Sequence, residues 1–166
     1  MRILGIDPGT ARFGYGIIDA DDRCFPVDFG VIESSAVDSM PRRLLKLHDA
    51  LSGLIDQYAP DVMAIEQLFF SRNVTTAIAV GQARGVALLT AAQSGMPVTE
   101  YTPAEIKQAI TGYGNADKRQ IQAMVQLLLE LESEPHPDDA ADALAVALCH
   151  GQSHAFQDRV SSGGSA

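Results

Sequence analysis

Acidic residues stand at three places where the sequence predicts the end or the start of a secondary-structure element. Asp7 closes the apolar run 2–7, Glu66 closes the apolar run 61–66, and "DDAAD" opens a helical pattern at residue 138. Ligand sites in α/β sheets gather just beyond strand ends. Neighbouring buried carboxylates repel each other, and Mg²⁺ or Mn²⁺ relieves this repulsion because these ions take oxygen ligands. Each acid alone fits a surface charge or a cap equally well, but together they favour a metal site.

The helical segment offers three aspartates, and spacing does not decide between them. Asp139 and Asp142 are three residues apart, Asp138 and Asp142 are four apart, and both spacings put two side chains on one helix face. Asp138 follows Pro137 and is well suited to be the N-cap of the helix. That interpretation leaves Asp139 and Asp142 for the site.

The elements that must position these acids follow from hydrophobic periodicity and turn residues. Short apolar runs predict strands at 2–7, 12–20, 25–34, 61–66 and 97–101. Helical spacing predicts helices at 41–58, 74–93, 102–112, 117–131 and from 138 onward. Thr102 and Glu105 form a capping-box pattern, and Gly112 ends that helix. The order predicts an α/β fold in which the first three strands form an antiparallel meander.

Length and composition indicate one ordinary globular domain. The chain has 166 residues, of which 46% are apolar and 20% are charged. We expect the domain to span 1–155 and the Ser- and Gly-rich tail 156–166 to be disordered. No apolar run approaches a membrane span and no secretory signal is visible, so we expect a cytoplasmic protein with no membrane role. The two cysteines match no metal spacing.

The net charge of −9 argues against a nucleic-acid partner when taken alone, because phosphate contacts need Lys and Arg. The charge is unevenly distributed, however. Residues 68–129 hold five Lys or Arg side chains against three acidic ones, whereas residues 130–142 hold six carboxylates and no Lys or Arg. A local basic footprint is therefore compatible with the acidic total.

The stretch "GIDPGT" also suits a second class of protein. A strand, an Asp and a Gly-Thr turn begin the actin-like and sugar-kinase ATPases, in which the turn cradles phosphate. That class needs a second lobe and further phosphate loops, and 166 residues leave no room for them.

Four segments, taken together and in order, carry a specific resemblance. "LGIDPGTARFGYGII", "AIEQLFFSRN", "GQARGVAL" and "DAADALAVALCH" resemble the RuvC family of Holliday junction resolvases over residues 2–150. The resemblance implies an RNase H-like fold, with a five-stranded mixed β-sheet flanked by α-helices. It also implies catalytic and metal-binding roles for Asp7, Glu66, Asp139 and Asp142, because the single "DAAD" leaves Asp138 outside.

The resemblance further implies an activity and its partners. The family consists of homodimeric endonucleases that cut four-way junction DNA symmetrically in recombination and repair, leaving 5′-phosphate and 3′-hydroxyl ends. Two Mg²⁺ or Mn²⁺ ions per active site can stabilise the attacking and leaving oxygens of such a displacement. Its members work with the RuvA and RuvB branch-migration proteins in the bacterial cytoplasm, at the nucleoid when acting. A noncatalytic junction-binding protein of the same fold is the alternative, and four intact acids argue against it.

Four residues match DNA-facing positions of that family. Phe69 corresponds to the aromatic side chain that enters the opened junction and stacks on a base. Arg72 suits a phosphate contact. Lys107 and Lys118 match basic positions near the scissile strand, and Lys118 lies at a predicted helix start, where the helix dipole disfavours a cation. Residues 74–93 have many small side chains that can pack closely on a partner, and Arg84 suits a buried pair in that helix.

Overall fold

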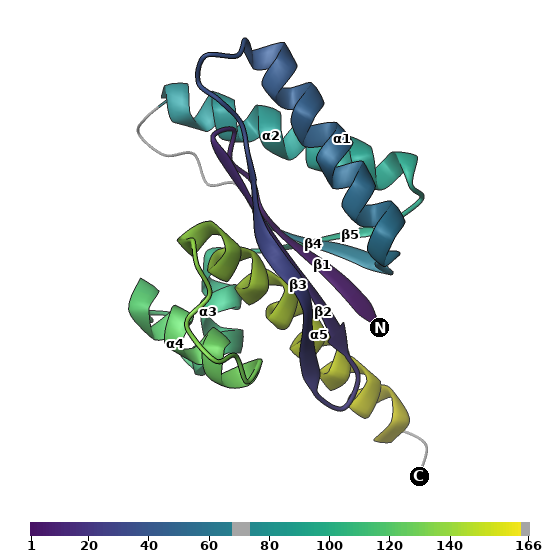
Figure 1. Ribbon diagram of the computed structural model, residues 1–166. Coiled ribbons are helices and arrows are strands. Elements are labelled where there is room, and N and C mark those ends of the chain that lie inside the picture. The colour runs from purple at the N-terminus through teal and green to yellow at the C-terminus, as the bar shows by residue number, and fades with distance from the viewer. Residues whose placement is uncertain (68–73, 164–166) are drawn as a thin grey trace.

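The computed structural model describes residues 1–67 and 74–163, and only the backbone of residues 157–163. A five-stranded sheet lies between two layers of helices (Figure 1). The strands are β1 (Arg2–Asp7), β2 (Arg12–Ala20), β3 (Cys24–Glu33), β4 (Val62–Glu66) and β5 (Val98–Tyr101). The helices are α1 (Met40–Tyr58), α2 (Val74–Gln93), α3 (Pro103–Thr111), α4 (Lys118–Leu128) and α5 (Asp138–Gly163). The predicted DNA-facing residues Phe69 and Arg72 lie outside the described residues.

The sheet has the strand order β3-β2-β1-β4-β5 and is mixed. β1, β2 and β3 pair antiparallel, which confirms the predicted meander. β4 is parallel to both β1 and β5. Ile6 is paired with Ile65 across β1 and β4. Asp7 and Glu66, the next residue of each strand, therefore end neighbouring strands at the same edge, as the sequence predicts.

Side-chain alternation puts both strand-end acids on the face covered by α5. Ile3 of β1 and Ala64 of β4 belong to the core cluster that includes α3, α4 and α5. The intervening residues, such as Leu4 and Met63, belong to the cluster packed against α1 and α2. Because side chains alternate along a strand, Asp7 and Glu66 project toward α5.

Two glycines allow α5 to lie unusually close to the sheet. A Cβ atom at Gly14 of β2 would collide with the carbonyl oxygen of Asp139, and one at Gly5 of β1 would collide with the carbonyl oxygen of Ala143. Only glycine leaves this space free. The first turns of α5 are thereby pressed onto β1 and β2, beside Asp7.

The helices next to the site begin and end at residues with recognisable caps. Thr102 and Glu105 form the predicted capping box of α3, and Gly112 ends it with a φ of 82°. Asp117 and Gln120 form a second capping box at the start of α4. α5 continues past residue 155 to Gly163. The single domain at 1–155 and the disordered tail at 156–166 stay predictions.

α2 is long and apolar enough to cross a membrane by length and composition, and it is the one such helix among the described residues. The segment contains no long uninterrupted apolar run, because small and hydroxyl side chains are mixed with aliphatic ones. Ala83, Ala87 and Ala91 of α2 are fully buried in the core that α1 and α2 share with the sheet. The absence of a membrane role stays a prediction.

Candidate active site

Four acidic side chains influence one another at the edge where β1 and β4 end. The pKa of Asp7 is raised to about 7, first by burial and then by the negative charges of Asp142, Asp139 and Glu66. A carboxyl group in this environment resists ionisation because burial and like charges both disfavour the anion. The fold therefore brings the four sequence-predicted acids into one electrostatic cluster.

Two of the other acids respond in the same way. Burial raises the pKa of Glu66, the charge of Asp142 raises it further, and Lys107 opposes the shift. Burial also raises the pKa of Asp142, with Lys118 acting against it. Clusters of perturbed carboxylates are typical of functional sites, because a purely structural surface would not gather repelling charges.

Asp138 borders this cluster and is held by side chains of α4. Its carboxylate accepts a hydrogen bond from Nε2 of Gln122 at 2.9 Å and lies 3.2 Å from Nζ of Lys118. The pKa of Asp138 is lowered, first by its hydrogen bond with Lys118 and then by that with Gln122. α5 begins at Asp138, so this residue is the first of the helix and the predicted N-cap role is wrong. The side chain instead bridges α5 to α4.

Both predicted lysines line a cavity beside the acids. The cavity has a volume of about 230 Å³, and its charged lining residues are Glu66, Asp142, Lys107 and Lys118. Nζ of Lys118 lies 3.2 Å from Oδ2 of Asp142. The apolar part of the wall comes from α3, α4 and α5. Two lysines and two carboxylates therefore line one cavity next to the end of β4.

The backbone at Glu66 is held from two directions. Nη1 of Arg84 in α2 donates to the carbonyl oxygen of Glu66 at 2.7 Å, while Nη2 pairs with Glu100 at 2.6 Å. The amide of Gln67 donates to the carbonyl oxygen of Tyr101 at 2.7 Å. The Arg84 side chain is only 11% exposed. The sequence correctly suggests a buried pair, and the structure places its partners within the same chain.

Arg12 is a charged neighbour that the sequence analysis did not single out. Its Nη1 lies 3.8 Å from Oδ2 of Asp139. The sequence contains a signal for this position, because Arg12 is the first residue of the strand that follows the "GIDPG" turn. In the antiparallel register Asp7 pairs with Gly14, which puts Arg12 just beyond the Asp7 end of β1.

An all-oxygen set of carboxylates is the donor chemistry that Mg²⁺ and Mn²⁺ prefer. Among residues 1–67 and 74–163, however, no three His, Cys, Asp or Glu side chains are grouped closely enough to hold one ion. The donor set fits a divalent ion.

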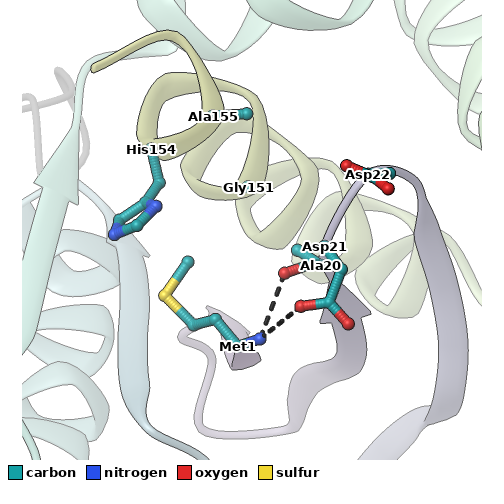
Figure 2. A pocket seen from close by; sticks show the side chains of 7 residues that line it. All are labelled: Met1, Ala20, Asp21, Asp22, Gly151, His154 and Ala155. Atoms are coloured by element: carbon teal, nitrogen blue, oxygen red, sulfur yellow. Dashed lines mark hydrogen bonds and ion pairs between the residues drawn. The ribbon is translucent and has the colours of Figure 1, made fainter. Parts of the chain in front are cut away.

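A second hollow, of about 440 Å³, lies at the other end of β1. Figure 2 shows the α-amino group of Met1 bonded to the carbonyl oxygen of Ala20 and the carboxylate of Asp21. Asp22 and His154 complete its charged or titratable lining. β1 separates this hollow from Asp7 by roughly 20 Å, at about 3.3 Å per residue. The cation in it is the chain's own terminus, and the hollow is not part of the acid cluster.

The mixed five-stranded sheet, with carboxylates gathered at the ends of β1 and β4 under α5, defines an α/β protein of the RNase H-like class. Residues 3–150 match the sequence profile described as "Crossover junction endodeoxyribonuclease RuvC". The chain belongs to this family of DNA endonucleases.

Curated relatives with the same description cover nearly the whole chain. One from Thermomicrobium roseum is 55% identical over 152 residues, which are 92% of this chain and 93% of the relative. One from Desulfitobacterium hafniense is 57% identical over 154 residues, with the same coverage. One from Roseiflexus sp. is 58% identical over 150 residues, 90% of this chain and 89% of the relative.

Solved structures agree. The structure described as "Thermus thermophilus RuvC structure" has a TM-score of 0.88 and 32% identity, covering 95% of this chain and 97% of that one. The structure described as "T. thermophilus RuvC in complex with Holliday junction substrate" has a TM-score of 0.87 and 30% identity, covering 94% and 96%. The yeast mitochondrial resolvase Ydc2, at 16% identity and a TM-score of 0.67, shares the fold.

Proposed function

We propose that this endonuclease resolves four-way DNA junctions, and that Asp7, Glu66, Asp139 and Asp142 form its catalytic and metal-binding centre. The observation that carries the assignment is the convergence of these acids: Asp7 and Glu66 end neighbouring parallel strands on the face covered by α5, whose first turns hold Asp139 and Asp142. Such a cluster is costly without a cation. The similar T. thermophilus protein, described in complex with Holliday junction substrate, supports the choice of DNA substrate.

Dependence on a divalent metal is general in this nuclease family, and we propose Mg²⁺ or Mn²⁺ with two ions per active site. Such ions would supply positive charge at the scissile phosphate and would lower the pKa of a water molecule. The four carboxylates would hold them, and the burial of Asp7 would limit the access of bulk solvent. Attack of water oxygen on phosphorus, with breakage of the P–O3′ bond, leaves 5′-phosphate and 3′-hydroxyl ends.

The basic side chains of the cavity bind the negatively charged strand. Lys107 and Lys118 line the same hollow as Glu66 and Asp142, so a phosphate held at the acids lies within their reach. DNA then competes with Asp138 and Asp142 for the ammonium group of Lys118. Phe69, which would stack on an unpaired base, and Arg72, which would contact a phosphate, stay predictions.

Symmetric cleavage of a four-way junction needs two active sites, and we propose that a second copy of the chain supplies the other. α2 exposes Val74, Ile78 and Leu89, which recur on one face of the helix. Burial of this face in a two-fold interface explains why so apolar a helix lies at the surface. The RuvA and RuvB proteins are proposed partners, and the bacterial cytoplasm, at the nucleoid during action, is the proposed location.

A cleavage assay tests the proposal. Four-way junctions labelled on each strand in turn are incubated with the protein and either Mg²⁺ or Mn²⁺ at low salt. We expect paired nicks in opposing strands, ligatable ends and no cut in linear duplex. Binding of junctions without cleavage in either metal would show a noncatalytic binding protein instead. Turnover of ATP without DNA cleavage would favour the ATPase class.

A further inference from the structure

An open groove lies on the other side of the acids from the two lysines. This Arg12 groove has a volume of about 550 Å³ and lies between the turn 9–12 and the first turns of α2. Arg12 and Thr75 are exposed side chains in its wall, and Asp139 lies at its edge. The groove therefore adjoins the acid cluster through Asp139. The cavity lined by Lys107 and Lys118, called the lysine cavity below, adjoins the cluster through Glu66 and Asp142.

The two hollows each present cationic side chains on opposite sides of the acids. Lys107 and Lys118 serve the lysine cavity, and Arg12 is the one Lys or Arg in the described lining of the groove. A DNA strand with one phosphate at the acids has charged phosphates on both sides of it. The lysine cavity can bind the phosphates on one side of the scissile phosphate, and the Arg12 groove can bind those on the other side.

Arg12 is chemically suited to that role and is weakly held. Its side chain is 58% exposed, and its distance of 3.8 Å to Asp139 is long for an ion pair. Exposed pairs of this kind contribute little, so the guanidinium group can exchange its partner. A guanidinium group binds phosphate oxygens in a two-pronged manner. The hydroxyl group of Thr75 supplies a further donor within the same groove.

We propose that Arg12 and Thr75 form a binding subsite for a backbone phosphate of the cut strand, on the Asp139 side of the scissile phosphate. The ligand is a phosphodiester of DNA, so the inference rests on the proposed function. The strand then crosses the protein from the Arg12 groove, over the acids, to the lysine cavity. This path explains how a chain with a net charge of −9 binds DNA with few basic residues.

The first experiment measures junction binding as a function of salt for Arg12→Gln and for a matched control. Arg42→Gln removes the same charge from an exposed position on α1. We expect Arg12→Gln to weaken binding several-fold at low salt and to reduce the slope of log K against log salt by about one. Arg42→Gln should change neither. Thr75→Val should weaken binding without changing the slope.

The second experiment locates the contact. A single uncharged methylphosphonate linkage is moved along the cut strand, one position at a time. Wild-type binding should weaken at one linkage next to the cleavage position, and Arg12→Gln should lose that sensitivity. An unchanged salt slope, or a shift only in the half-saturating metal concentration, would mean that Arg12 merely neutralises Asp139. Wild-type protein that binds but fails to cut would contradict the proposed function and leave the subsite result standing.

Discussion

At the scale of single residues, the three aspartates of "DDAAD" divide into two groups. Asp139 and Asp142 contribute to the electrostatic cluster around Asp7, whereas Asp138 is bonded to Gln122 and Lys118 of α4. Being adjacent in the sequence puts Asp138 and Asp139 about 100° apart around the helix, because 3.6 residues complete a turn. Substitution of each should therefore give a different result.

Asp139→Asn and Asp142→Asn should each reduce cleavage of a four-way junction by about 10²-fold or more, since each removes a charge that we propose to bind metal and that would be worth several kcal/mol. Junction binding should survive in a gel-shift assay with metal omitted. Asp138→Asn should keep cleavage within about threefold of wild type, because its amide oxygen still accepts from Gln122 and only an exposed ion pair is lost. Full activity of Asp139→Asn together with an inactive Asp138→Asn would reverse the assignment.

Asp7 should make stability depend on pH when metal is chelated. Its folded-state pKa of about 7 exceeds its ordinary value of 3.8, so the folded protein binds a proton that the unfolded chain releases. The free energy of unfolding therefore falls as pH rises from about 4 to 7. Asp7→Asn removes this pH-dependent loss of unfolding free energy. The melting temperature of the variant should therefore fall less than that of wild type between pH 5 and pH 8.

For a domain of this length, each kcal/mol of stability changes the melting temperature by roughly 2–4 °C. This relation sets the expected difference in melting temperature between Asp7→Asn and wild type. Differential scanning fluorimetry in EDTA measures it. Asp56→Asn, at an exposed position on α1, is the control and should follow wild type. Equal pH dependence in Asp7→Asn and wild type would mean that Asp7 ionises normally.

At the scale of elements, Arg84 joins α2 to the ends of two strands. It donates to the carbonyl oxygen of Glu66 and pairs with Glu100 of β5. Arg84→Gln should lower kcat about tenfold and raise the half-saturating metal concentration, because the backbone at Glu66 loses a charged donor. The KM for the junction should be unchanged, since Arg84 is largely buried.

Two variants separate a positioning role from a general loss of stability. Arg84→Lys keeps a charged donor and should recover part of kcat. Glu100→Gln keeps the bond between Arg84 and Glu66 and should affect metal dependence less than Arg84→Gln does. A lowered melting temperature with unchanged kcat and metal dependence, measured well below unfolding, would assign Arg84 to stability alone.

Most elements could be predicted because their signals are local. The capping box at Thr102 and the apolar run ending in Asp7 depend on neighbouring residues, and both are found where expected. The ion pair between Arg12 and Asp139 joins residues 127 positions apart, and the contact of Asp138 with Lys118 depends on how α4 meets α5. The N-cap role of Asp138 is predicted from the local sequence alone. In the structure its side chain instead contacts Lys118 and Gln122 of α4.

At the scale of the whole molecule, the exposed apolar face of α2 should determine the oligomeric state. Ile78→Glu puts a charge in the centre of that face and should convert a dimer to a monomer in sedimentation velocity, because a buried unpaired charge is costly. Cleavage should then yield single nicks in place of paired ones. Leu127→Glu, at an exposed position on α4, should stay dimeric. A dimeric Ile78→Glu would place the interface elsewhere.

The close approach of α5 to the sheet has a consequence for how mutational scans of this protein would be interpreted. Gly5 and Gly14 do no chemistry, yet no other side chain fits where each faces a carbonyl oxygen of α5. A scan scored by recombination in cells would rank these glycines with the acids as intolerant. If the scan measures the amount of folded protein, it would separate the two groups. Neutralising Asp7, Glu66 or Asp142 relieves an unfavourable buried charge, whereas enlarging either glycine costs stability.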